Sequence, residues 1–337
     1  MTDKIKNYGF DPVETQASIT PEDFVFGDGQ LEARFEGLTP ITNGQWDDFL
    51  PPYEEQKFGW GDTYHCTVYG TENAIQALAK AKYGVSEEYS ERYLGVLAGI
   101  RNGSGGSPHT VIEKWKNSGN LLYKFLPFEN IKSWTEFNSP NPMSADLILE
   151  GKKWLTKYRI GHDWVYDFTP ENLMEALKFS PIGVGVYAWP NPVDGIYNKP
   201  SGVRDNHWII IYGYVKDKYW KAYDHYDGGF KKLAWGYRFE FAKRFTLESL
   251  IPNEETMTKV EIEVVKKKGT PDYLVRGKSG MYHRIGDEAT FGEIVGDFDP
   301  GIEEMDIAKD YIGSPLYLVN NLVKVVLAFL TNLKGRK

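Results

Sequence analysis

The sequence of 337 residues contains a single cysteine, Cys66, in the segment WGDTYHCTVYGTENAIQAL. A lone cysteine excludes a disulfide within the chain, so its thiol serves either packing or chemistry. Packing is the ordinary alternative, because free cysteine is among the most buried residue types. The rest of the sequence has to decide between the two.

Other absences exclude several classes of protein. No cluster of lysine and arginine runs through the first 250 residues and the net charge is -8, so a nucleic-acid partner is not expected. The opening residues MTDKIKNYGFDPVETQ lack the apolar core of a secretory signal, which predicts a cytoplasmic protein with a reduced thiol. An HExxH pattern is missing and GSGGS is not followed by a P-loop lysine, so neither a metal nor a cofactor is predicted.

The patterns that are present change period along the chain. Residues 1–45 are broken by proline and glycine and predict an extended arm with short strands. Apolar residues at helical spacing predict helices over 66–83, with a stop at Gly84, and over 86–100, 107–119 and 169–180, the last with Thr169 as N-cap. Aromatic and β-branched runs predict antiparallel strands over 182–189, 207–215, 219–226 and 237–245. Helices followed by strands indicate an α+β fold.

Three residues form a candidate catalytic group within this pattern. Cys66 opens the first of those helices, where unpaired backbone N–H groups lower a thiol pKa. His207 begins a strand, and the turn KDK after that strand predicts a hairpin that returns Asp224 to His207. A carboxylate in that place would orient the imidazole as a base for the thiol. The alternative for His207 is a polar group satisfied within the core.

This order of residues resembles the papain-like cysteine peptidases, in which a histidine follows the cysteine after about 130 to 150 residues. Here the difference is 207 minus 66, or 141. The segment FLPPYEEQ is similar to the family's pre-cysteine segment and carries Gln56, whose amide the resemblance implies as an oxyanion donor. NGSGGS resembles the family's Gly-Gly turn, which implies Gly105 and Gly106, together with Asn206 beside the histidine, as substrate-binding residues. The resemblance covers residues 46–245 and implies the papain-like fold.

The chain also departs from the family. DTYHCTV replaces Cys-Gly-Ser-Cys-Trp, and Cys66 stands ten positions after Gln56 where the family usually has six. Asp224 replaces an asparagine and is expected to accept the Nδ1–H of His207. His65 is expected to be a solvated histidine rather than a metal ligand. DTYHC and YDHY look closer to peptidases encoded by tailed bacteriophages, which implies a virion-associated or host-cytoplasmic enzyme.

The expected function is cleavage of peptide bonds in a peptide or protein substrate through a thioester on Cys66. Two alternatives stay open at this point. Papain-like cores also cleave peptidoglycan, so the chain could be a cell-wall amidase or peptidase. A structural or binding protein on a peptidase scaffold, with an inert Cys66, would carry the same pattern.

Four segments are predicted along the chain. An arm over 1–45 precedes the peptidase domain over 46–250, and YLVRGKSGMYHRIGDEATFGEIVG predicts a hairpin and a short helix within a small β module over 251–300. The segment 301–337 is predicted to be an amphipathic helical tail, whose helix begins at Ser314 and is apolar on most of its surface. Such a helix favours association with protein, as a homo-oligomer or in a virion, over contact with a membrane.

Overall fold

The computed structural model describes residues 7–21, 23–26 and 41–250, and beyond these the backbone of four short strands. The chain divides into two compact units, Met1–Ile251 and Pro252–Lys337. The first unit contains all the predicted site residues. The two units are described separately.

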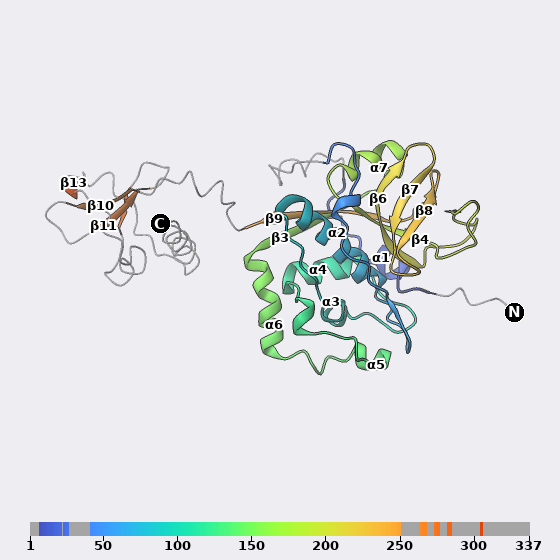
Figure 1. Cartoon of the computed structure of the whole chain (residues 1–337), viewed down its shortest axis with the longest axis horizontal. Helices are drawn as coiled ribbons and strands as arrows, with labels where there is room; N and C mark the ends of the chain where they lie inside the picture. The colour runs from blue at the N-terminus through green and yellow to red at the C-terminus, as the bar shows by residue number, and fades with distance from the viewer. Residues whose placement is uncertain are drawn as a thin grey trace. The chain divides into compact units, whose positions relative to one another are not determined.

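The helices of the first unit gather mostly on one side of it (Figure 1). They are α1 (Pro12–Ala17), α2 (Cys66–Tyr83), α3 (Glu91–Ala98), α4 (Pro108–Ser118), α5 (Trp134–Phe137), α6 (Ala145–Lys152) and α7 (Pro170–Leu177). The predicted helix at 66–83 is confirmed, and it ends where Gly84 adopts a left-handed φ of 65° that favours glycine. Three of the predicted helices thus correspond to α2, α4 and α7, and α3 is shorter than its predicted range.

A mostly antiparallel sheet of seven strands forms the other side of the unit. Its strands, in spatial order, are β3 (Tyr158–Trp164), β9 (Ala242–Ser249), β4 (Ile182–Val186), β6 (His207–Val215), β7 (Tyr219–Tyr223), β8 (Phe230–Ala234) and β5 (Ile196–Tyr197). Only the β5–β8 pairing is parallel within this sheet. The predicted α+β class and the papain-like division into a helical and a β side are confirmed.

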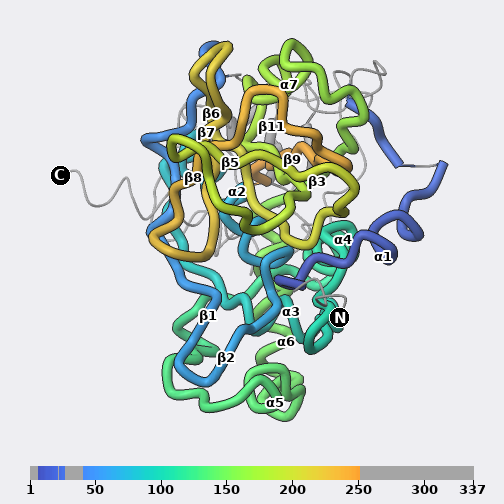
Figure 2. The backbone as a smooth tube through the Cα atoms, turned by 90° about the vertical axis from the view of Figure 1, so that its right-hand side faces the viewer, coloured from blue at the N-terminus to red at the C-terminus, as the bar shows by residue number. Residues whose placement is uncertain are grey.

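Helix α2 lies between the sheet and helices α3 and α4 (Figure 2) and packs on β6. Small residues make the close approach possible, since a Cβ on Gly70 would lie 2.8 Å from the Trp208 ring. The core between the two sides contains Ile75, Leu78 and Ile209, all without exposed surface. This packing brings the first turn of α2 toward the first residues of β6, which carry Cys66 and His207.

Some sequence predictions were wrong in detail. The arm contains α1, which Asp11 caps by accepting from the N–H groups of Val13 and Glu14. The last predicted strand begins five residues later than expected, at Ala242. Strands β3 and β8 were not predicted. Thr169 precedes α7 as expected, but its side chain makes no capping hydrogen bond.

The second unit has a small sheet with the order β12-β11-β10-β13. Its strands are β10 (Glu263–Lys267), β11 (Tyr273–Arg276), β12 (Tyr282–Arg284) and β13 (Glu304–Met305). β11 and β12 pair antiparallel, which confirms the predicted hairpin. The predicted short helix after it and the predicted tail from Ser314 lie outside the described residues.

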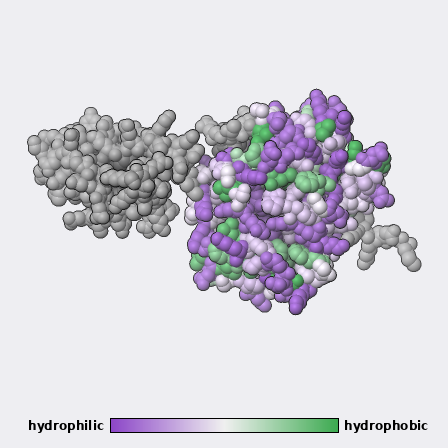
Figure 3. Space-filling model, viewed as in Figure 1, coloured by the Kyte–Doolittle hydropathy of each residue, from purple (hydrophilic) through white to green (hydrophobic). Residues whose placement is uncertain are grey.

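The surface of the first unit is mainly hydrophilic on the face shown in Figure 3, with apolar residues in small groups. Within the described part of the chain, no helix combines the length and the apolar character that crossing a membrane requires.

Candidate active site

Cys66 is the first residue of α2 and has no exposed surface. Burial raises the pKa of its thiol well above the ordinary value, while a hydrogen bond from the backbone N–H of Trp208 acts in the opposite direction. The lowered thiol pKa expected from the helix start is therefore wrong for this structure, because desolvation outweighs the helix. The Trp208 contact also shows that the thiol lies beside the residue that follows His207.

His207 and Asp224 form a buried pair. The Nε2–H of His207 donates to Asp224 Oδ1 over 2.6 Å, and neither side chain has exposed surface. The hairpin of β6 and β7 makes this pair, as the sequence predicts. The ring nitrogen is not the predicted one, because Nε2 rather than Nδ1 faces the carboxylate. His207 Nδ1 is buried without a hydrogen-bond partner among the described residues, so it is free to accept a proton.

Asp224 accepts from several donors. Its Oδ1 also accepts from the backbone N–H of His225 at 2.7 Å, and its Oδ2 accepts from Trp189 Nε1 at 2.8 Å. Burial alone would raise the Asp224 pKa, but the His207 pair outweighs it and the pKa is lowered. An asparagine could satisfy only part of this set, since its NH2 group would face the indole N–H of Trp189. The indole N–H of Trp189 therefore favours aspartate over asparagine at this position.

Gln56 is fully buried, and its Nε2 lies within hydrogen-bond distance of three acceptors. They are Tyr8 O at 2.9 Å, Asp62 Oδ1 at 2.8 Å and the Tyr226 hydroxyl at 2.7 Å. The backbone is held as well, because the Gln56 N–H donates to His225 O. The side-chain amide thus points at a backbone carbonyl of the arm, which is the group that a peptide substrate would present to an oxyanion donor.

The arm lies across these residues as an extended peptide. The Tyr8 N–H donates to Asn206 O at 3.0 Å, while the Tyr8 carbonyl accepts from Gln56. The Gly106 N–H then donates to Gly9 O at 3.1 Å, and the Gly106 carbonyl accepts from the N–H of Asp11 at 3.1 Å. Main-chain hydrogen bonds of this kind are how an extended peptide binds without regard to its side chains.

Phe10 anchors the arm. Its ring stacks on Trp208 with 5.5 Å between centroids and meets Phe241 edge-on at the same distance. These rings form one buried cluster with Cys66 and Trp164. Phe10 itself has no exposed surface, so its burial contributes to holding the arm over the thiol.

The predicted substrate-binding residues Gly105, Gly106 and Asn206 all meet the arm. Gly105 has a φ of 69°, and a Cβ there would lie 1.8 Å from Gly9 O, so only glycine permits the contact. The described structure therefore brings Cys66, His207 and its neighbours to one place and covers that place with residues 8–11. The roles of these residues stay predictions.

Two more histidines near the site are buried, and one of them, His65, differs from expectation. His65 is fully buried rather than solvated; its Nδ1 lies 2.6 Å from Thr63 O, and burial lowers its pKa to about 4. His225 is also buried, and its pKa falls to about 3 for the same reason. Among the described residues, no group of three or more potential ligands could hold a metal ion.

Sequence reasoning missed Asp62, Tyr226 and Trp189. Asp62 and Tyr226 surround the Gln56 amide, and the Trp189 ring meets His207 edge-on with 5.9 Å between centroids. Asp62 lies within the long loop before Cys66, and Tyr226 stands two residues after Asp224. Their closeness in sequence to Cys66 and Asp224 was the signal that could have identified both.

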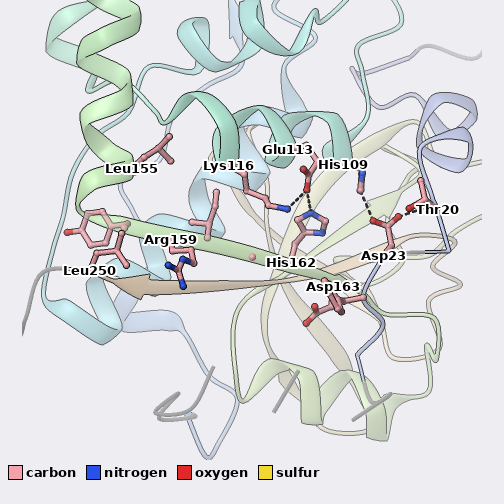
Figure 4. Close-up of a pocket in the computed structure, with 14 residues that line it drawn as sticks. Thr20, Asp23, His109, Glu113, Lys116, Leu155, Arg159, His162, Asp163 and Leu250 are labelled. Carbon is pink, nitrogen blue, oxygen red and sulfur yellow. Dashed lines mark hydrogen bonds and ion pairs between the residues drawn. The ribbon is translucent and has the colours of Figure 1, made fainter. Parts of the chain in front are cut away.

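A separate cavity of about 810 Å³ has none of the candidate catalytic residues in its lining. Figure 4 shows the side chain of His162, which projects from β3 toward α4, with its Nε2 2.7 Å from Glu113 Oε1. On its other side, His162 Nδ1 accepts from Lys243 Nζ at 2.9 Å. Burial lowers the pKa of His162 to about 3 and that of Lys243 to about 7, whereas the His162 hydrogen bond lowers that of Glu113 to about 2.

Comparison with known proteins supports the fold. The structure is similar to that of the Amb a 11 cysteine protease, a ragweed pollen allergen solved in its proform, with a TM-score of 0.52 and 14% identity over 74% of this chain and 71% of that one. The chain has the papain-like fold. Bromelain from Ananas comosus, solved with the E64 inhibitor, is 20% identical over 60% of this chain and 98% of its own, with a TM-score of 0.45.

At the level of sequence, neither a protein-family model nor a curated protein matches the chain. Identities this low establish a shared fold and not a shared reaction.

Proposed function

We propose that this papain-like protein is a cysteine peptidase that uses Cys66, His207, Asp224 and Gln56. One observation carries the proposal. The buried imidazole of His207 pairs with the buried carboxylate of Asp224 through one ring nitrogen, and the other ring nitrogen has no partner among the described residues. Leaving a buried ring nitrogen unpaired costs free energy, so its presence indicates a functional role. His207 directly precedes Trp208, whose backbone N–H donates to the Cys66 thiol.

The proposed reaction begins when His207 Nδ1 accepts the thiol proton and Cys66 Sγ attacks the carbonyl carbon of the substrate. The carbonyl oxygen becomes an oxyanion that accepts from Gln56 Nε2 and the Cys66 backbone N–H. His207 then gives its proton to the leaving amine as the C–N bond breaks, which leaves a thioester on Cys66. Water, deprotonated by His207, releases the acid and restores the thiol. Asp224 holds the imidazole by accepting from Nε2 throughout.

The alternative of an inert thiol draws support from the complete burial of Cys66. The arm supplies another reason for that burial. We propose that residues 8–11 must leave before a substrate enters, because they take the Asn206 carbonyl, both backbone groups of Gly106 and the Gln56 amide. Virion association and cleavage of peptidoglycan stay predictions, since no described residue bears on either.

Alkylation tests the proposal without a mutation, because the chain has one cysteine. The full chain is incubated with iodoacetamide, and the alkylated fraction by mass spectrometry is compared with the remaining hydrolysis of a peptide p-nitrophenyl ester. Hydrolysis is expected to fall in proportion to alkylation. Undiminished hydrolysis by fully alkylated protein would contradict a role for the thiol.

Weakening the arm is expected to uncover the site. Phe10→Ala removes the ring between Trp208 and Phe241, and large-to-small changes of this kind cost about 3–5 kcal/mol in a core. If even part of this loss destabilises the docked arm, the rates of Cys66 alkylation and ester hydrolysis should rise about tenfold or more. Val13→Ala, at an exposed residue of α1, is the matched control and should change neither rate. Equal rates in all three proteins would mean that the arm does not limit access.

Gln56→Ala tests the oxyanion donor. Removing a donor that acts on the transition state is expected to lower kcat by about 100- to 1,000-fold and to leave KM nearly unchanged. Steady-state kinetics on the same ester measure both constants. A kcat equal to that of the parent chain would show that Gln56 only holds the arm.

A further inference from the structure

The loop between Gln56 and Cys66 contains a carboxylate with an unusual set of partners. β1 (Lys57–Phe58) and β2 (Gly61–Asp62) form a short hairpin that returns Asp62 to the side of Gln56. Asp62 Oδ1 accepts from Gln56 Nε2 and from the N–H of Tyr64, both at 2.8 Å. Its Oδ2 accepts from the hydroxyl of Tyr226 at 2.5 Å.

Asp62 determines which way the Gln56 amide faces. With Nε2 toward Asp62, one N–H points to the side of Asp62 Oδ1 and the Tyr226 hydroxyl, and the amide can direct the other at the Tyr8 carbonyl. The reversed amide would place its oxygen against the Asp62 carboxylate and the Tyr8 carbonyl, and three acceptors would then meet without a proton between them. The carboxylate therefore excludes the orientation in which Gln56 donates nothing to a substrate carbonyl.

The same carboxylate holds the turn before Cys66. Tyr64 has a φ of 58°, a left-handed conformation that a residue with a side chain adopts at a cost of about 1 kcal/mol. The hydrogen bond from the Tyr64 N–H to Asp62 Oδ1 stabilises that turn. α2 begins two residues later, so the turn sets where the backbone N–H of Cys66 points.

We infer that Asp62 is a positioning residue that fixes both oxyanion donors, the Gln56 amide and the Cys66 backbone N–H. This inference rests on the proposed function, because it assigns those two groups to an oxyanion. It also gives the extended loop a role, since the hairpin of β1 and β2 is what carries Asp62 back to Gln56.

The charge of Asp62 opposes the chemistry that its geometry supports. After burial, the negative charges that raise the Cys66 pKa include that of Asp62. A neutral hydrogen-bond acceptor in the same place should therefore hold the Gln56 amide and the Tyr64 N–H without raising the Cys66 pKa through its charge. Asp62→Asn provides one, because its Oδ1 can still accept from Gln56 and Tyr64, while its NH2 can donate to the Tyr226 oxygen.

Steady-state kinetics of ester hydrolysis by the full chain separate positioning from general stability. Asp62→Ala is expected to lower kcat by about 10- to 100-fold with KM within about threefold, and Asp62→Asn to keep kcat within about threefold of the parent. Asp47→Ala, which removes an exposed carboxylate paired with Lys221, is the matched control and should leave both constants unchanged. An unchanged kcat in Asp62→Ala, or an equal loss in Asp62→Asn, would overturn the inference.

A spectroscopic measurement decides the inference independently of activity. The chain has five glutamines, and selective ¹⁵N labelling makes their side-chain amide resonances visible by NMR. The pair of resonances that disappears in Gln56→Ala belongs to Gln56. Asp62→Ala is expected to change the chemical shifts of that pair, whereas Asp62→Asn is expected to leave them nearly unchanged. If hydrolysis survives complete alkylation of Cys66, the proposed function fails. The Gln56 resonances still test whether Asp62 positions the Gln56 amide, because unmoved resonances in Asp62→Ala would contradict that role.

Discussion

His207→Ala is expected to lower kcat for ester hydrolysis by at least about a thousandfold, as Cys66→Ala is expected to do. The reason is that the two residues form one proton-transfer unit. Without the imidazole, the buried thiol stays protonated, because burial already raises the Cys66 pKa well above its ordinary value. The two losses should not add in the double variant, since either change removes the whole unit.

The controls for this result separate chemistry from folding. His109→Gln changes a histidine that lines the separate cavity, and it should keep most of the activity. Circular dichroism should show that the catalytic variants remain folded. A folded His207→Ala protein with parent-like kcat would remove His207 from the mechanism and leave Cys66 without a base.

Acid is expected to unfold the protein over a window set by its buried histidines. Burial lowers the pKa of His65 to about 4 and those of His162 and His225 to about 3. An unfolded histidine titrates near 6.5, so between about pH 6.5 and 3 the unfolded chain binds more protons than the folded one. Stability from these groups is therefore present above pH 6.5 and lost as the pH falls.

The expected loss is large. By pH 5, each of the three histidines should cost about 2 kcal/mol of unfolding free energy, and several kcal/mol together are comparable with the whole stability of many domains. The carboxylates of Asp224 and Glu113, whose pKa values are lowered, add to the loss at still lower pH. Lys243 affects stability in a different pH window, because burial lowers its pKa to about 7 in the folded protein. Above that pH the unfolded chain binds the extra proton, so the free energy of unfolding rises with pH there.

Urea unfolding followed by tryptophan fluorescence at pH 8, 6.5 and 5 measures this dependence. His225→Gln is the informative variant, since it removes one titrating group and should flatten the pH dependence whatever it does to stability at pH 8. A free energy of unfolding that stays constant from pH 8 to 5 would show that these histidines titrate normally and are open to water.

Much of the candidate site could be predicted from local sequence. Cys66 opens a helix that ends at Gly84, and both boundaries follow from short-range patterns. The hairpin that returns Asp224 to His207 also follows from two neighbouring strands and their turn. The ring nitrogen that faces Asp224 could not be predicted, because it depends on side-chain rotations that the surrounding packing determines.

Other features depend on contacts between distant residues. Phe10 lies about 200 residues from Trp208 in sequence, and nothing near Phe10 distinguishes it from an ordinary apolar residue of an arm. β3 was missed because His162 and Asp163 interrupt its apolar pattern. In the folded protein, Glu113 on α4 and Arg244 on β9 pair with these two residues and offset the cost of burying them.

The central claim is that Cys66 forms a thioester during turnover. The full chain is mixed with a peptide p-nitrophenyl ester, quenched with acid within milliseconds, digested, and examined by mass spectrometry. The proposed mechanism predicts that the acyl group appears on the peptide containing Cys66 before the free acid accumulates, and that it is absent from Cys66→Ala. Hydrolysis with Cys66 unmodified, or with the acyl group on another residue, would contradict it.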